Sequence, residues 1–290
     1  MTIYCLGSIN VDHVHRVSRF PVAGETLTDE GYVVCLGGKG ANQAIAAARS
    51  LTKTRFIGAV GTDGLWALDL LRDAGVETEA IATLETATGH AVIYVDPNGE
   101  NIIVIHGGAN QALTESMIDA ALSPAKPGDW FLAQNETNRV TESIASAKAR
   151  GLKTAYSAAP FDAASAEAVL PHLDVLAVNE GEASALRAHL GHDPDVPMLV
   201  TTLGARGVTI KQRGEAAPLT IPSFPVTPTD TTGAGDTFIG TFIGALDQGA
   251  NIADAAKTAS AAAAISVTRP GAADAIPTAA EVTAFLESQA

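Results

Sequence analysis

Residues 41–75 read ANQAIAAARSLTKTRFIGAVGTDGLWALDLLRDAG, and this stretch decides the fold class. An alanine-rich segment with a helical pattern comes first, the apolar run RFIGAVG follows, and a second helical segment ends at Gly75. Glycine directly after a helical segment is typical of a helix C-terminus, because glycine adopts the left-handed conformation there without strain. The stretch therefore predicts a helix, a buried strand and a second helix.

The same alternation continues on both sides of this stretch. Short apolar runs at residues 3–8, 129–135, 153–160 and 175–180 predict strands, and residues 139–151 predict an intervening helix. Parallel strands need a long crossover connection, which a helix supplies. We therefore expect a three-layer α/β fold, in which a mostly parallel sheet carries helices on both faces.

Two segments interrupt this alternation, at about residues 13–35 and 88–105. In the second, VIYVDPNGENIIVIHGG predicts a β-hairpin that turns at Asp96–Gly99. An ordinary surface hairpin is the alternative. Because strands without a crossover helix do not extend a parallel sheet, we expect a small antiparallel sheet that covers the site as a lid. No linker or repeat divides the chain, so we expect residues 1–290 to form one domain.

Composition excludes several functions. The net charge of −14 over 290 residues argues against binding to nucleic acid or to an anionic membrane, since both need a cationic surface. Cys5 and Cys35 are too few for a disulfide framework or a zinc cluster. The sequence has no basic leader and no apolar run of about 18 residues, so we expect a soluble cytoplasmic protein.

The segment DTTGAGDTFIG, residues 230–240, places small residues directly before a helical run. Amides at Gly233, Ala234, Gly235 and Asp236 would form an anion cradle at the helix N-terminus. Asp236 could then accept a proton from an attacking hydroxyl. The alternative is an aspartate that only caps the helix. Neither a P-loop nor a GxGxxG fingerprint is present.

A second glycine segment, LGGKGANQAIAAA at residues 36–48, also leads into a helix. Its glycines let the backbone approach a ligand, Lys39 supplies a charge, and Asn42 can donate to and accept from hydroxyl groups. A glycine turn into a packed helix with a solvated lysine is the alternative.

Near the N-terminus, the predicted strand YCLGSIN ends in Asn10, followed by Asp12. Two polar side chains at alternate positions of a strand lie on the same side, where a carboxylate and an amide could hold vicinal hydroxyls. The carboxyl end of a strand is also where α/β folds bind ligands. A local turn that uses both side chains for backbone bonds is equally compatible with the sequence.

Taken together, these segments resemble the ribokinase family of sugar kinases, which includes the phosphofructokinase-B type enzymes. GSINVDH, FPVAGET, GGKGANQA, IHGGAN, VNEGEA, TLGARGV, DTTGAGDTF and SVTRPGA occur in the order of that family and span nearly the whole chain. The resemblance implies the family fold and an ATP-dependent kinase, with O5 of ribose as the expected acceptor. It also implies a homodimer formed through the lid.

The resemblance assigns site residues by position. The expected sugar contacts are Asn10, Asp12, Gly38, Lys39, Asn42 and Glu136, with Asp236 as the base and Gly233, Ala234 and Gly235 as the anion hole. The expected ATP contacts are Asn179, Thr202, Leu203, Gly204, Ala205, Arg206, Gly207, Gly235, Asp236 and Ser260. Glu182 would act on Mg²⁺ through water, and Asp230, Thr232, Ser266, Arg269, Gly271 and Ala275 would surround K⁺.

Departures from the family pattern leave alternatives open. QNET stands where the family usually has a Gln-Leu-Glu type segment, and SAAP at residues 157–160 replaces an Asn-Pro-Ala-Pro run. Residues 183–200 form a shorter stretch than the family pattern implies, and Ser260 stands where the family often has histidine near adenine. A kinase for another sugar, a sugar acid or a nucleoside is therefore the main alternative, and a non-catalytic sugar or nucleotide sensor is a second. The matching segments add no arginine to the sugar pocket, which favours a neutral pentose. Individually, Arg206 could be a surface residue, Glu182 a solvated helix residue, and Glu136 a cap of the next helix.

Overall fold

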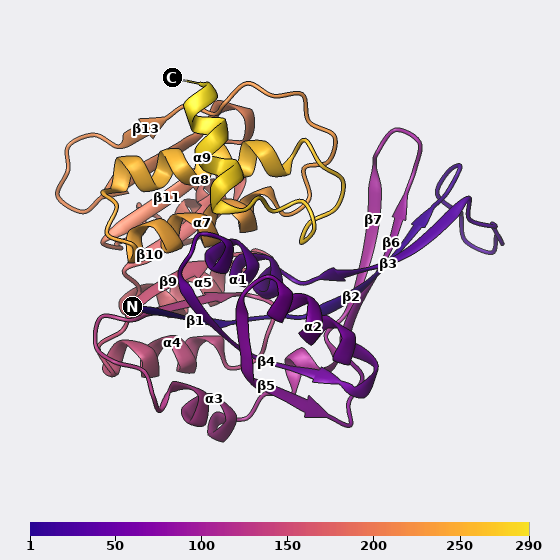
Figure 1. The fold of residues 1–290 in the computed structure, drawn as a ribbon, viewed down its shortest axis with the longest axis horizontal. Helices are drawn as coiled ribbons and strands as arrows, with labels where there is room; N and C mark the ends of the chain where they lie inside the picture. Colours follow the sequence, from indigo (N-terminus) through magenta and orange to yellow (C-terminus); the bar gives the residue numbers. More distant parts are fainter. Residues whose placement is uncertain (290) are drawn as a thin grey trace.

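A nine-stranded sheet forms the centre of the computed structural model, which describes residues 1–289 (Figure 1). Its strand order is β13-β12-β11-β10-β9-β8-β1-β4-β5. The strands from β11 to β5 are parallel, and β12 and β13 add an antiparallel edge. The strands are β1 Thr2–Leu6, β4 Lys53–Gly61, β5 Val76–Leu84, β8 Trp130–Gln134, β9 Lys153–Ser157, β10 Val175–Asn179, β11 Met198–Thr202, β12 Val208–Gln212 and β13 Leu219–Ile221.

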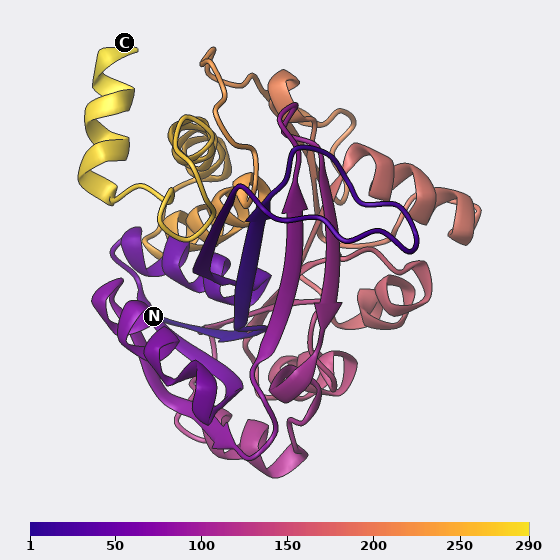
Figure 2. The same ribbon diagram turned by 90° about the vertical axis from the view of Figure 1, so that its right-hand side faces the viewer.

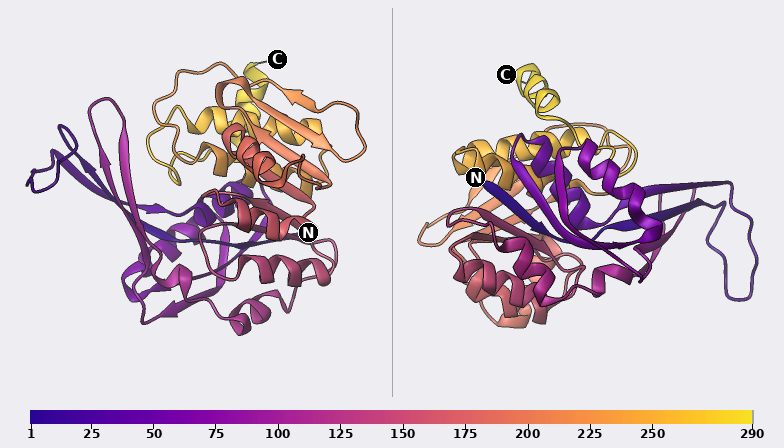
Figure 3. Two further views of the ribbon diagram at one scale, coloured as in Figure 1. Left: turned by 180° about the vertical axis from the view of Figure 1, so that it is seen from behind. Right: turned by 60° about the horizontal axis from the view of Figure 1, so that its bottom comes forward.

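Helices cover both faces of this sheet, so the expected three-layer fold is confirmed (Figure 3). One face carries α1 Lys39–Arg49, α2 Leu65–Asp73, α7 Ala234–Asp247 and α8 Ile252–Ser266, with α9 Ala279–Ser288 packed on α8. The other carries α3 Glu115–Leu122, α4 Val140–Ala149, α5 Ala163–Val169 and α6 Glu180–Leu190. Within residues 1–289, no helix has the length and apolarity needed to cross a bilayer.

Strand β1 shows why the strand segments are continuously apolar. Ile3 and Cys5 belong to the core on the α1/α7 side, whereas Tyr4 and Leu6 belong to the core on the α3–α6 side. Alternate side chains of a strand point to opposite faces, and both faces of this sheet are covered, so every position needs an apolar residue.

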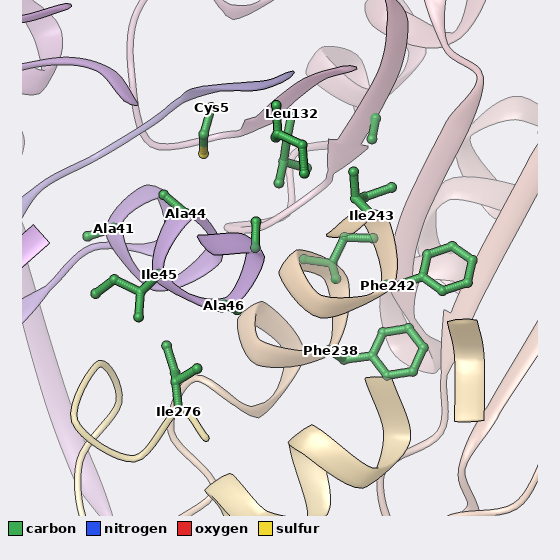
Figure 4. Close-up of a cluster of buried hydrophobic side chains, with 14 of the residues drawn as sticks. Cys5, Ala41, Ala44, Ile45, Ala46, Leu132, Phe238, Phe242, Ile243 and Ile276 are labelled. Atoms are coloured by element: carbon green, nitrogen blue, oxygen red, sulfur yellow. The ribbon is translucent and has the colours of Figure 1, made fainter. Parts of the chain in front are cut away.

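Helices α1 and α7 pack closely because small residues separate them. Figure 4 shows Ala44, Ile45 and Ala46 of α1 beside Phe238, Phe242 and Ile243 of α7. A Cβ on Gly240 would lie 2.3 Å from the Gln43 carbonyl oxygen, and a Cβ on Gly40 would lie 2.5 Å from Gly7 Cα. The two glycines thus let α1 approach both α7 and β1, which brings polar residues of α1 to the N-terminus of α7.

A second sheet of four strands extends from the body of the molecule (Figure 1 and Figure 2). Its order is β3-β2-β6-β7, with bounds β2 Asn10–Arg16, β3 Gly31–Gly37, β6 Gly89–Val95 and β7 Asn101–His106. The predicted small sheet is therefore present. Both of its hairpins are antiparallel, and they meet through a parallel pairing of β2 with β6, which the sequence did not indicate.

The prediction that Asn10 and Asp12 end the first strand is wrong. Strand β1 ends at Leu6, and Asn10 and Asp12 begin β2 of the small sheet instead. Residues Gly7–Ile9 interrupt the strand, and a Cβ on Gly7 would lie 2.4 Å from Gly40 Cα. The chain therefore leaves the main sheet where α1 approaches it, and the two polar side chains belong to the covering sheet.

Candidate active site

Two adjoining cavities lie at the carboxyl edge of the main sheet, beside the N-terminus of α7. The larger has a volume of about 740 Å³ and the smaller a volume of about 200 Å³. Five residues line both cavities, namely Thr202, Thr231, Ala234, Gly235 and Phe238. A ligand with a large end and a small end can therefore lie across the first turn of α7.

The first turn of α7 presents unpaired amides to these cavities. Gly233 precedes the helix with a φ of 71°, and no side chain caps the helix. The Ala234 amide donates to the Thr231 carbonyl at 3.3 Å, whereas the amides of Gly235 and Asp236 have no backbone partner among the described residues. Unpaired amides at a helix start favour a bound anion. The turn therefore has the form of the predicted anion cradle.

Gly235 is not required by the fold itself. Its φ lies outside the left-handed region, and a Cβ at this position would meet no atom within 4 Å. Because Gly235 lines both cavities, that Cβ would occupy cavity space. The glycine thus keeps room for a ligand directly over the free amides.

Asp236 lines the smaller cavity, and 7% of its surface is exposed. Its Oδ1 accepts from Gln43 Nε2 at 2.7 Å, and its Oδ2 accepts from Asn42 Nδ2 at 3.4 Å. Burial raises the pKa of this carboxyl group, while the nearby Lys39 charge opposes the rise. The alternative that Asp236 only caps the helix is wrong, because its carboxylate bonds to α1 and not to the amides of α7.

Glu136 follows β8 and accepts hydrogen bonds from Ser8 and from the predicted sugar residue Lys39. Its Oε2 accepts from the Lys39 amide at 3.0 Å and from the Ser8 hydroxyl. Burial and the Glu136 carboxylate together raise the pKa of Asp12 to about 7, although the Lys39 charge opposes the rise. Glu136 does not cap the next helix, because α4 begins after Arg139.

The remaining predicted sugar residues are fixed by the backbone around them. Asn10 Oδ1 accepts from Asn110 Nδ2 at 2.8 Å, and Asn110 also bonds to the amide and carbonyl of Ile9. Gly38 has a φ of 96°, and a Cβ there would lie 2.6 Å from the Ser8 carbonyl oxygen. The structure thus links Asn10, Asp12, Gly38, Lys39, Asn42, Glu136 and Asp236 into one neighbourhood, built from β2, α1, α7 and the loop after β8.

Most of the predicted nucleotide residues line the larger cavity, which contains Thr202, Gly204, Ala205, Gly207 and Ser260. Its apolar wall also contains Phe224, Pro225 and Val226, which sequence reasoning missed. Leu203 and Arg206 line neither cavity. The Arg206 side chain is 64% exposed, and its guanidinium pairs with Glu180 of α6.

Asn179 and Glu182 line the smaller cavity and also close the N-terminus of α6. Asn179 Oδ1 accepts from the Glu182 amide at 2.9 Å, and Glu182 Oε2 accepts from the Asn179 amide at 2.8 Å. This reciprocal pair is a capping box, which satisfies two amides at the helix start. Burial raises the pKa of Glu182. The Asn-x-x-Glu segment therefore has a structural role that its sequence reading did not include.

The residues expected around K⁺ lie in two loops next to the first turn of α7. Asp230 accepts from the amides of Thr232 and Gly271, each at 2.9 Å, and so joins the loops. Burial by itself would raise the pKa of Asp230. These hydrogen bonds outweigh burial, so the pKa lies below its ordinary value. Ser266 is the last residue of α8, and Arg269 and Ala275 lie in the segment between α8 and α9. The donor atoms available in this set are the Asp230 carboxylate, the Thr232 and Ser266 hydroxyls and backbone carbonyls, and such oxygens suit an alkali cation.

Sequence reasoning missed three buried amides that hold the site together. Gln43 bonds to Asp236, Gln134 bonds to Gln43, and Asn110 bonds to Asn10. The sequence position of Gln134 could have indicated its role, because it is a polar residue at the carboxyl end of the otherwise apolar strand WFLAQ. A polar side chain in a strand buried on both faces needs a partner.

Known proteins resemble this chain over nearly its whole length. Residues 2–279 match the family described as pfkB family carbohydrate kinase. The chain is 38% identical to the ribokinase of Haemophilus influenzae, over 99% of this chain and 98% of that protein. The ribokinase structure from Thermotoga maritima has a TM-score of 0.88 at 34% identity and covers 99% of both chains. The Arabidopsis thaliana ribokinase complexed with ribose and ATP has a TM-score of 0.86 at 27% identity, over 99% of this chain and 98% of that one.

Proposed function

Because this chain belongs to the pfkB family of carbohydrate kinases, we propose that it transfers the γ-phosphoryl group of ATP to the O5 hydroxyl of D-ribose. One observation carries the proposal. A buried carboxylate, Asp236, directly follows the free amides that face the junction of a large and a small cavity. This arrangement provides a base and an anion cradle next to each other, as phosphoryl transfer requires.

In the proposed reaction, the sugar lies against Asn10, Asp12, Gly38, Lys39, Asn42 and Glu136, and Asp236 takes the proton of its hydroxyl group. The sugar oxygen then bonds to the γ-phosphorus, and the bond from that phosphorus to the bridging oxygen breaks, so that ADP leaves with the electron pair. The anion hole of Gly233, Ala234 and Gly235 surrounds the transferred group, and the free amides of Gly235 and Asp236 stabilise its charge. The raised pKa of Asp236 suits a general base, since a more basic carboxylate accepts a proton more readily.

The nucleotide would occupy the larger cavity. The residues from Thr202 to Gly207 would lie along it, and Ser260 would lie near the base, where the apolar wall accommodates adenine. Asn179 would contact the phosphates from the smaller cavity.

Two cations fit the residues present. Mg²⁺ neutralises phosphate charge when bound, and Glu182 would hold one of its waters, which agrees with the single carboxylate that α6 offers to the cavity. K⁺ would be held by Asp230, Thr232, Ser266, Arg269, Gly271 and Ala275. Since Asp230 already joins the two loops beside α7, a cation there would stabilise the position of the anion cradle.

We further propose that residues 1–290 form one domain in which the small sheet is a lid over the site. We also propose that two copies of the chain form a homodimer through this lid. Strands β3 and β7 expose a row of large apolar side chains, which supports burial against a partner. These are Tyr32, Val33, Val34, Ile102, Ile103, Val104 and Ile105. Sedimentation velocity of the wild type and of Ile103→Glu tests this, and a monomeric wild type would refute it. We place the enzyme in the cytoplasm, where ATP and free sugars meet.

The test of function is ADP release from Mg-ATP with ribose, deoxyribose, fructose, nucleosides and keto-deoxy sugar acids, each with and without K⁺. Preference for ribose with K⁺ activation is the expected result. Preference for another acceptor would retain the mechanism and change the substrate. Absence of turnover with every acceptor would favour a sugar or nucleotide sensor.

The variant Asp236→Asn tests the base. We expect kcat to fall by about 10²- to 10⁴-fold, the usual contribution of general base catalysis. Asp254→Asn is the matched control, because this exposed carboxylate lies in the first turn of the neighbouring helix α8. Similar turnover by Asp236→Asn and the wild type would remove Asp236 from the mechanism.

A further inference from the structure

Two glutamine side chains form an ordered support beneath Asp236. Gln43 Nε2 donates to Asp236 Oδ1 at 2.7 Å, and Gln134 Nε2 donates to Gln43 Oε1 at 2.8 Å. Both glutamines are fully buried, and neither lines the cavity that contains Asp236. The hydrogen bond from Gln43 to Asp236 therefore connects this buried pair to the cavity.

The carboxylate determines the direction of both amides. An ionised carboxylate only accepts hydrogen bonds, so Gln43 must direct its NH₂ group toward Asp236 and its oxygen toward Gln134. Gln134 must then donate to Gln43, and among residues 1–289 its own buried oxygen has no hydrogen-bond partner. An unpaired buried amide oxygen lowers stability. Stability alone therefore does not account for this arrangement, whereas the orientation of Asp236 does.

We propose that Gln43 is a positioning residue for the catalytic base and that Gln134 sets the direction of its amide. The proposal rests on the proposed role of Asp236. A short bond to a charged oxygen is stronger than a neutral one, so Oδ1 stays engaged by Gln43. Oδ2, with only the longer 3.4 Å contact from Asn42, is then the oxygen presented to the sugar hydroxyl.

The first test is Gln43→Met, which keeps the length of the side chain and removes its donor. We expect kcat to fall by about tenfold to a hundredfold, since a charge-assisted hydrogen bond is worth about 1.5–3 kcal/mol. The acid limb of kcat should move to higher pH, because the bond from Gln43 lowers the pKa of Asp236. KM for the sugar should change little, since Gln43 does not line the cavity.

Other charges near Asp236 remain in place in this variant. Lys39 lowers the pKa of Asp236 and Glu136 raises it. Burial raises the pKa of the nearby Cys5 thiol to about 12, so Cys5 stays neutral. Ile45→Val is the control, because it removes one methyl group from the buried face of α1 without touching Asp236, and its pH profile should match the wild type.

A second readout does not depend on turnover. The carboxyl carbon of Asp236, followed by ¹³C NMR, should titrate at higher pH in Gln43→Met than in the wild type. Absence of wild-type turnover would refute the proposed function, while this titration would still decide the role of Gln43. An unchanged titration in the variant overturns the inference.

Gln43→Glu serves if Gln43→Met does not fold. Two carboxyl groups at this separation share a proton, so Asp236 should titrate at a still higher pH. An unshifted titration of Asp236 in this variant also overturns the inference.

Discussion

Asp12 is expected to make sugar binding depend on pH near neutrality. Burial and the Glu136 carboxylate raise its pKa from an ordinary value of 3.8 to about 7. If the ionised form accepts hydrogen bonds from the sugar, affinity follows the ionised fraction. That fraction is about nine tenths one unit above the pKa and about one tenth one unit below it, so Kd should rise about tenfold between these two pH values.

The assay is titration calorimetry of ribose without ATP at these two pH values. Asp12→Asn should bind the sugar with no such pH dependence, because its amide does not titrate in this range. Asp29→Asn is the control. Asp29 lies in the loop between β2 and β3, and its carboxylate pairs with His15 of β2. Equal wild-type affinity at both pH values, or an unaltered pH dependence in Asp12→Asn, would refute the reasoning.

The same shift predicts a change in stability. Because the folded-state pKa of Asp12 lies above 3.8, the folded protein binds more protons than the unfolded chain between these two values. The contribution of Asp12 to stability is therefore present at low pH and is lost as the pH rises through about 7. Urea denaturation should show Asp12→Asn to be more stable than the wild type above that pH, and the difference should shrink as the pH falls.

Three further substitutions separate the requirements of the fold from those of the ligand. Gly235→Ala should leave the free energy of unfolding unchanged or raise it by up to about 1 kcal/mol, because alanine has the higher helix propensity. The same variant should raise KM for ATP, because its Cβ enters the cavity, and unaltered kinetics would contradict this. Gly40→Ala should lower stability in urea by about 1–3 kcal/mol or more, since its Cβ meets Gly7 Cα and Ser8 N at 2.5 Å, and wild-type stability would contradict it. Ser260→Leu should raise KM for ATP without changing ribose affinity, and the opposite pattern would place the base elsewhere.

The local pattern of the sequence was sufficient for the main sheet and its helices. Strands buried on both faces read as apolar runs, and helices end at glycines such as Gly75 and Gly151, whose φ values are 89° and 80°. These signals depend only on neighbours in the chain. The shape of the first turn of α7, which we propose as the anion cradle, was also predictable, because residues 230–240 contain the loop, the helix start and Asp236 together.

Contacts between distant segments were decided only by the tertiary structure. Gln43 and Asp236 are 193 positions apart, and Gln43 and Gln134 are 91 apart. No local pattern indicates such a bond, because it arises from the close packing of α1 on α7 and β8. The break after Leu6, which moves Asn10 and Asp12 into the small sheet, has the same origin in the contact of Gly7 with Gly40. The sequence by itself thus determined which chemical groups are present and which elements carry them, whereas packing decided how those groups face one another.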